Sequence, residues 1–129
     1  MTAQQLLQHA VKARDRAVAP FSRFKVGAAL LTSLGKLYTG CNIENASYGL
    51  TVCAERVALW NALSEGERAF TRMAVASDSE PPAAPCGACR QLLWEFCGDL
   101  EILVGNASGV KESHRLASLF PRPFDQRSL

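Results

Sequence analysis

Pro85-Cys86-Gly87-Ala88-Cys89 is the stretch that decides how this chain folds, because it marks the start of a helix that follows a loop. A second predicted helix start carries Cys53-Ala54-Glu55-Arg56. A helix N-terminus has positive partial charge and free N–H groups, which favour thiolates over thiols. Because Cys86 and Cys89 are three residues apart, both side chains can point to one side of the first turn. The spacing therefore predicts that cysteines at the starts of two helices can bind one metal ion.

Apolar spacing predicts alternating helices and strands outward from these two starts. A capping-box pattern at Thr2 and Gln5 opens the first helix, which is expected to run to about Ala17. Pro85 stands where helix starts favour proline. The expected elements are, in chain order, a helix over residues 2–17, strands over 26–32 and 37–43, a helix from 52 that Gly66 ends, a strand over 73–76, a helix over 86–96 that Gly98 ends, strands over 100–104 and 110–112, and a short helix over 115–120.

Strands that alternate with helices form a sheet covered by helices. We therefore expect an α/β fold with a mixed, mostly parallel five-stranded sheet, parallel after the first hairpin, and helices on both faces. The chain has 129 residues and a mass of 14.0 kDa, which is the length of one domain. Residues 1–129 are expected to form that single domain, since the sequence contains no repeat, low-complexity segment or linker.

Composition excludes several classes of protein. Hydrophobic residues make up 48% and charged residues 20%, as in ordinary globular proteins, and no apolar run approaches the ~20 residues of a membrane span. The net charge of +2 is too balanced to indicate a nucleic acid or a membrane surface as partner. Five cysteines without an export signal predict reduced thiols and a cytoplasmic location, where cysteines more often bind metals or catalyse than form disulfides.

Three cysteines leave one position of a tetrahedral zinc ion open, and an open position marks a catalytic zinc site. Zinc lowers the pKa of bound water toward neutrality. Glu55, two residues after Cys53, is placed to take the proton of that water and deliver it to a substrate. Zinc with three thiolates carries net negative charge, so we expect Arg56 to offset it by donating hydrogen bonds to cysteine sulfurs. Gln91 is a further candidate for a supporting role near Arg56.

Other interpretations of the cysteines remain open. They could form a closed structural zinc site with a fourth ligand, although Cys97, about 12 Å farther along the helix than Cys89, is too distant to supply it. They could also act in thiol redox chemistry through Cys86 and Cys89. Cys41 and Cys97 are expected to be small buried hydrophobic residues. Metal content and thiol titration would separate these interpretations.

Cys-x-Glu upstream of Pro-Cys-x-x-Cys is the three-cysteine form of the zinc-deaminase signature. With Ala19-Pro20-Phe21-Ser22, Val26-Gly27-Ala28-Ala29-Leu30 and Gly40-Cys41-Asn42-Ile43-Glu44-Asn45-Ala46-Ser47-Tyr48-Gly49, the chain resembles the small homotetrameric zinc-dependent cytidine deaminases over nearly its whole length. The resemblance implies that family's α-β-α sandwich, one zinc ion per subunit, and a homotetramer with sites at subunit boundaries.

The reaction that the resemblance implies is hydrolytic deamination of cytidine and deoxycytidine to uridine and deoxyuridine, with release of ammonia, in pyrimidine salvage. Cys53, Cys86 and Cys89 would hold zinc. Zinc-bound hydroxide would attack C4 of the pyrimidine while Glu55 shuttles protons.

Substrate contacts follow from the same resemblance. Asn42 and Glu44 would bind the ribose hydroxyls, and their alternation at a strand end lets both side chains face one way. Phe24 would pack on the pyrimidine ring, and the Ala54 backbone would hold the pyrimidine carbonyl.

Two further aromatic residues are expected at subunit boundaries: Phe124 would reach the site of a neighbouring subunit, and Tyr48 would lie near a boundary. Other substrates of the same chemistry are weighed against cytidine. A polynucleotide would need a cationic, aromatic-lined channel, which the near-neutral charge disfavours. Another cytosine nucleoside, such as a nucleoside antibiotic, is less favoured because Asn42 and Glu44 suit an ordinary ribose.

Overall fold

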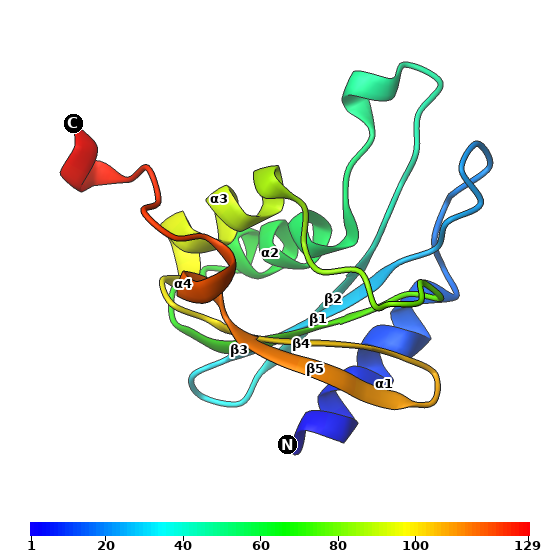
Figure 1. Ribbon diagram of the computed structural model, residues 1–129, viewed down its shortest axis with the longest axis horizontal. Coiled ribbons are helices and arrows are strands. Elements are labelled where there is room, and N and C mark those ends of the chain that lie inside the picture. The colour runs from blue at the N-terminus through cyan, green and yellow to red at the C-terminus, as the bar shows by residue number, and fades with distance from the viewer.

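The computed structural model describes all of residues 1–129. Helices and strands alternate along the chain, with two short 3₁₀ turns (Figure 1). In chain order the elements are α1 (Ala3–Arg14), β1 (Gly27–Thr32), β2 (Leu37–Cys41), a 3₁₀ turn (Tyr48–Leu50), α2 (Ala54–Ser64), β3 (Phe70–Ala76), α3 (Gly87–Cys97), β4 (Glu101–Asn106), β5 (Gly109–Arg115), α4 (Leu116–Leu119) and a second 3₁₀ turn (Gln126–Ser128). None of the helices has both the length and the apolar character needed to cross a membrane.

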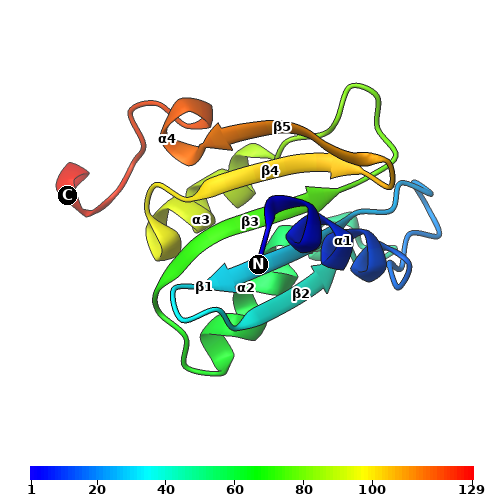
Figure 2. The same cartoon turned by 90° about the horizontal axis from the view of Figure 1, so that it is seen from below.

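The five strands form one mixed sheet in the order β2-β1-β3-β4-β5 (Figure 2). β1 is antiparallel to both β2 and β3, β3 is parallel to β4, and β4 is antiparallel to β5. The expectation of a mostly parallel sheet is therefore wrong, although the mixed five-stranded sheet is confirmed. The crossover through α2 does join two strands that point the same way, β2 and β3, but β1 lies between them. Tight turns then make β1 with β2, and β4 with β5, antiparallel hairpins.

Helices cover both faces of the sheet, as expected. In Figure 1, α1 lies on one side of the sheet and α2 and α3 lie on the other. Leu6 and Leu7 of α1 pack in one buried cluster with Ala29 of β1. Leu59 of α2 packs in the other buried cluster with Leu30, the next residue of β1. Because successive residues of a strand face opposite sides, β1 is apolar on both faces, and all six of its residues are buried.

The bounds of several elements differ from the predicted ones. The capping box of Thr2 and Gln5 is present, but α1 ends at Arg14, before Ala17, because the chain leaves the helix to pair Val18 with Ile43. Pro85 precedes α3 rather than opening it, since Cys86 is the N-cap. Strands β3 and β5 are longer than predicted, because backbone pairing of β3 with β1 already begins at Phe70 and pairing of β5 with β4 continues to Arg115.

Gly40 allows α2 to approach β2 closely. A Cβ atom at Gly40 would stand 2.5 Å from the backbone nitrogen of Ala58 and 2.7 Å from the carbonyl oxygen of Ala54. Real Cβ atoms do not make contacts this short, so only glycine fits here without moving the helix. Because Gly40 has no side chain, the first turn of α2, where Glu55 lies, can pack directly against β2.

Candidate active site

Three cysteine sulfurs meet where α2 and α3 begin. Cys53 is the N-cap of α2, Cys86 is the N-cap of α3, and Cys89 lies in the first turn of α3. The three Sγ atoms, called the sulfur cluster below, all lie within 4.8 Å of one another. The Cys53 and Cys86 sulfurs are 3.9 Å apart, which is too far for a disulfide, and all three thiols are free. Both helix starts and the gathering of the sulfurs are as the sequence predicted.

The sulfur cluster has the dimensions of a zinc site. Two sulfurs at 2.3 Å from a tetrahedral zinc ion would be about 3.8 Å apart, close to the 3.9 Å between Cys53 and Cys86. Only three cysteine ligands are present, so a fourth position stays open for a small molecule. Cys97 does not belong to the cluster; it is partly buried elsewhere, and burial raises the pKa of its thiol to about 12.

Arg56 supplies positive charge beside the sulfur cluster. Its Nη2 donates a hydrogen bond to Cys53 Sγ at 3.3 Å. Hydrogen bonding from Cys89, and then from Arg56, lowers the pKa of Cys53 to about 5 against the effect of burial. The pKa of Cys89 is raised by its hydrogen bond to Cys53 and by burial. Arg56 Nε is buried without a hydrogen-bond partner, and such a buried cationic donor fits a centre whose three thiolates outweigh the charge of a zinc ion.

Glu55 is the buried carboxylic acid of the site. It occupies the first turn of α2 and is only 5% exposed. Burial, and to a lesser degree the charge on Cys53, raises the pKa of Glu55 to about 7. A carboxyl group with a pKa near neutrality can both accept and donate a proton at the working pH of most enzymes. The structure thus gives Glu55 the environment of a general acid–base group.

A cavity of about 250 Å³ opens beside Glu55 and the sulfur cluster, and we call it the central cavity. Its walls bring together, from distant parts of the sequence, most of the predicted site residues. The sequence did not predict Ser22 and Thr51 among them; a signal for Ser22 was its place within the quoted stretch before Phe24. The lining residues are Ser22, Phe24, Val26, Asn42, Glu44, Thr51, Val52, Cys53, Ala54, Glu55, Val75, Ala83, Ala84 and Cys86.

Asn42, the residue after β2, fastens one end of the loop of residues 21–26. Asn42 Oδ1 accepts from the Val26 backbone N–H at 2.8 Å, and Asn42 Nδ2 donates to the Phe24 carbonyl at 2.7 Å. The side chain is 9% exposed and lines the central cavity. This pair of bonds fixes the backbone on both sides of Phe24's neighbour Lys25, and so holds the Phe24 ring at the cavity wall.

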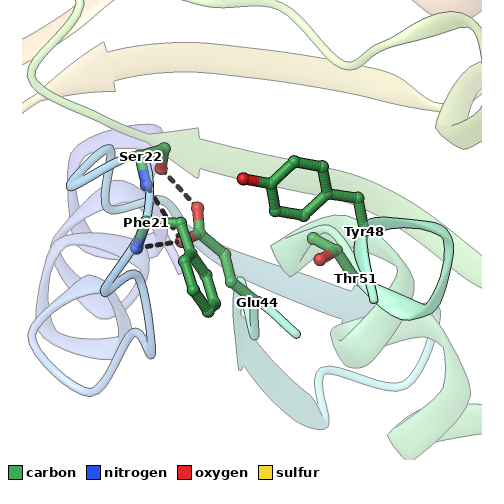
Figure 3. A pocket seen from close by; sticks show the side chains of 5 residues that line it. All are labelled: Phe21, Ser22, Glu44, Tyr48 and Thr51. Atoms are coloured by element: carbon green, nitrogen blue, oxygen red, sulfur yellow. Dashed lines mark hydrogen bonds between the residues drawn. The ribbon is translucent and has the colours of Figure 1, made fainter. Parts of the chain in front are cut away.

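Glu44 fastens the other end of that loop (Figure 3). Its Oε1 accepts from the backbone N–H groups of Phe21 and Ser22 at 2.9 and 3.1 Å, and its Oε2 accepts from the Ser22 hydroxyl. Hydrogen bonding from Ser22 lowers the pKa of Glu44 below the ordinary range of a glutamate. Glu44 therefore reaches the cavity as an ionised acceptor.

Tyr48, Phe124 and Gln91 lie outside the central cavity. Tyr48 is 75% exposed and lines a neighbouring hollow of about 330 Å³, where its ring packs edge-on against Phe21 with centroids 6.0 Å apart (Figure 3). Phe124 is 60% exposed in the C-terminal segment. Gln91 Nε2 donates to the Phe124 carbonyl at 2.8 Å, rather than to Arg56 or the sulfur cluster. The boundary roles of Tyr48 and Phe124 stay predictions.

Fold and site together define a zinc-dependent deaminase. A family model described as "Cytidine and deoxycytidylate deaminase zinc-binding region" matches residues 1–105. The chain belongs to the cytidine deaminase family and is an enzyme of the deaminase class. The prediction of zinc as cofactor is confirmed at this level by the family's zinc-binding region and the sulfur cluster.

Sequence similarity to known proteins extends over all or nearly all of the chain. It is 45% identical to a cytidine deaminase from Sporosarcina psychrophila, over 100% of this chain and 96% of that protein. It is 48% identical to a cytidine deaminase from Halalkalibacterium halodurans, over 96% of this chain and 95% of that protein. The crystal structure of cytidine deaminase from Burkholderia pseudomallei superposes with a TM-score of 0.93 at 47% identity, covering 96% of this chain and all of that one. The α/β fold is thus confirmed.

Proposed function

We propose that this enzyme hydrolyses cytidine and deoxycytidine to uridine and deoxyuridine with release of ammonia. The observation that carries the proposal is the composition of the central cavity, which joins a buried carboxyl group and a sulfur cluster to hydrogen-bonding groups and an aromatic side chain. The carboxyl group and the sulfur cluster suit hydrolysis at a carbon–nitrogen bond. The hydrogen-bonding groups and the aromatic side chain suit binding of a nucleoside. Similar proteins that carry the name cytidine deaminase support the same substrate.

The chain's own residues supply the proton transfers of this reaction. Cys53, Cys86 and Cys89 would hold the zinc ion, which would supply Lewis-acid activation of a water molecule at neutral pH. Glu55 takes a proton from that water and delivers it to N3 of the pyrimidine as the water oxygen bonds to C4. Glu55 then takes the proton of the new C4 hydroxyl and delivers it to the amino group, so that the C4–N bond breaks, ammonia leaves and C4 becomes a carbonyl. A pKa near 7 suits both directions of transfer.

Recognition of the nucleoside falls to the rest of the cavity. Asn42 and Glu44 bind the ribose hydroxyls, Phe24 packs on the pyrimidine face, and the backbone of Ala54 holds the pyrimidine carbonyl. Phe24 is 41% exposed, which leaves ring surface available for a base, and an aromatic ring is a sound platform for one. The ionised Glu44 is a better partner for neutral hydroxyls than for a phosphate.

The assembly and setting of the enzyme are also part of the proposal. We infer a homotetramer with one zinc ion per subunit and sites at subunit boundaries, in which Tyr48 and Phe124 contact neighbouring sites. The high exposure of both aromatic side chains supports this. Residues 1–129 act as one domain. The free thiols suit the reducing cytoplasm, and pyrimidine salvage is the proposed use of the reaction.

An ultraviolet assay with cytidine tests the proposed function directly. Purified protein, with its zinc content measured, is expected to convert cytidine and deoxycytidine to the corresponding uracil nucleosides. Cytosine in single-stranded DNA serves as the comparison substrate, and no conversion of it is expected. Zinc-loaded protein that leaves both nucleosides unchanged would overturn the proposal, and conversion of the DNA alone would favour a polynucleotide substrate.

A further inference from the structure

One hydroxyl group joins the two sides of the proposed nucleoside site. Ser22 Oγ–H donates to Glu44 Oε2, and Ser22 Oγ accepts from the Phe24 backbone N–H at 3.0 Å. A serine hydroxyl has one donor and two acceptor positions. Ser22 therefore uses its donor on the carboxylate proposed to hold the ribose, and an acceptor position on the backbone of the aromatic residue proposed to cover the base.

Glu44 has nearly all of its hydrogen-bonding capacity committed to this loop. A carboxylate offers about four acceptor positions, two on each oxygen. The backbone N–H groups of Phe21 and Ser22 occupy Oε1, and the Ser22 hydroxyl occupies one position of Oε2. One position of Oε2 is left for a donor from the central cavity, which Glu44 lines. That capacity suits a single sugar hydroxyl.

The Ser22 hydroxyl fixes the direction in which the free acceptor position of Glu44 Oε2 points. The two amide bonds to Oε1 hold the carboxylate at one oxygen only, so without Ser22 the group can turn about that oxygen. Ser22 also lines both the central cavity and the neighbouring hollow of Phe21 and Tyr48, and Figure 3 shows its side chain directed at the Glu44 carboxylate. Asn42 holds the Phe24 carbonyl independently, so loss of Ser22 should leave the loop in place but release Glu44.

We propose that Ser22 is a positioning residue for ribose recognition, which fixes the free acceptor position of Glu44 and ties it to the backbone of Phe24. This inference rests on the proposed function, because it concerns the same cavity. It adds a residue that does not itself touch the reacting atoms but determines how strongly the enzyme favours nucleosides with sugar hydroxyls.

Steady-state kinetics on two substrates test the inference. The enzyme variants are Ser22→Ala, Ser22→Thr, and Ser33→Ala as control; Ser33 is exposed in the turn between β1 and β2. The substrates are cytidine and 2′,3′-dideoxycytidine, which lacks the 2′- and 3′-hydroxyls of the ribose. For Ser22→Ala the KM for cytidine should rise about tenfold with little change in kcat, as expected when a hydrogen bond to a charged group is lost.

The second substrate separates positioning from general damage to the loop. Ser22→Ala should raise the KM for dideoxycytidine by about threefold or less, because this substrate has no ribose hydroxyl for Glu44 to hold, and only the lost bond to the Phe24 backbone can affect its binding. Ser22→Thr keeps a hydroxyl and should restore the wild-type KM for cytidine. An equal rise for both substrates, an unchanged KM for cytidine, or a failure of threonine to restore it would each overturn the inference. A wild-type enzyme that leaves cytidine unchanged would instead overturn the proposed function, and the inference with it.

Discussion

Arg56 donates a hydrogen bond to the Cys53 sulfur across 3.3 Å, and the two residues share the first turn of α2. Cys53 stands at the N-cap, where the helix adds positive partial charge, and the Arg56 guanidinium adds a full charge next to it. A single helical turn thus provides a sulfur ligand, the cation that stabilises its thiolate, and between them the acid–base residue Glu55.

Replacing Arg56 with alanine removes the cation that offsets the net negative charge of a zinc ion with three thiolates. We expect weaker zinc binding and a fall in kcat/KM of about 10- to 100-fold, the usual effect of losing a partner that hydrogen-bonds a metal ligand. Zinc content after dialysis against a chelator, together with cytidine turnover, measures both effects. Lys111→Ala, on the exposed edge strand β5, is the charge-matched control. Wild-type zinc retention and turnover in Arg56→Ala would exclude this role.

Glu55→Ala should lower turnover severely while leaving zinc bound, because Glu55 transfers protons but is not a ligand. The expected loss in kcat is about 10²- to 10⁴-fold, the range for removal of a general acid–base group. Turnover and metal analysis on the same preparation separate the two roles. Glu65→Ala, an exposed residue that caps the other end of the same helix, should behave as wild type. Near-normal activity in Glu55→Ala would contradict the proposed proton transfers.

Local patterns predicted the elements of the fold well, but not the directions of its strands. The capping box at Thr2 and the helix end at Gly98 are signals that involve a few neighbouring residues, and the structure confirms both. Whether β3 pairs with β2 or with β1 depends on contacts between strands that are far apart in the sequence. The prediction placed parallel neighbours after the hairpin, whereas β1 lies between β2 and β3.

The site shows the same division between local and distant signals. Cysteine spacing and the adjacent Glu55 predicted the sulfur cluster and its acid–base neighbour, because their chemistry restricts where they can stand. Ser22 had only one weak signal, its place in the stretch before Phe24, because an exposed serine in a loop is common, and only the fold brings it to Glu44. Gln91 was expected near Arg56, but from α3 its side chain reaches the C-terminal segment and donates to the Phe124 carbonyl instead.

Gly40→Ala should destabilise the protein and lower its activity together. The added Cβ would meet the backbone of α2 at Ala54 and Ala58, and backbone atoms cannot turn aside as a side chain can. Such overpacking costs about 1–3 kcal/mol, and the shifted helix would carry Glu55 away from its position. Chemical denaturation and cytidine turnover measure the two effects. Gly49→Ala, where a Cβ meets nothing within 4 Å, is the control for stability. Unchanged stability in Gly40→Ala would show that α2 can shift freely.

Substitution of Asp125 should detach the C-terminal segment, the residues that follow α4, from α3. Changes of pH near neutrality should not detach it. Asp125 Oδ2 accepts from the Trp94 indole at 2.9 Å and from Arg127 Nη2 at 2.7 Å. Hydrogen bonds from Arg127 and then Trp94 hold the pKa of Asp125 well below its usual range. Because the folded-state pKa is depressed, the contribution of Asp125 is complete above the usual pKa of about 3.9 and is lost only as the pH falls further.

Trp94 fluorescence and chymotryptic cleavage after Phe124 report on this release. Asp125→Ala should change the emission of Trp94 and speed the cleavage several-fold at neutral pH, because the indole loses its acceptor. The exposed ion pair with Arg127 contributes little by itself, so Arg127→Ala should have a much smaller effect. Asp15→Ala, at the end of α1, is the control. The wild-type emission should stay constant from about pH 5 to pH 9. Equal cleavage of Asp125→Ala and wild type would mean that Gln91, through its bond to the Phe124 carbonyl, is enough to hold the segment on α3.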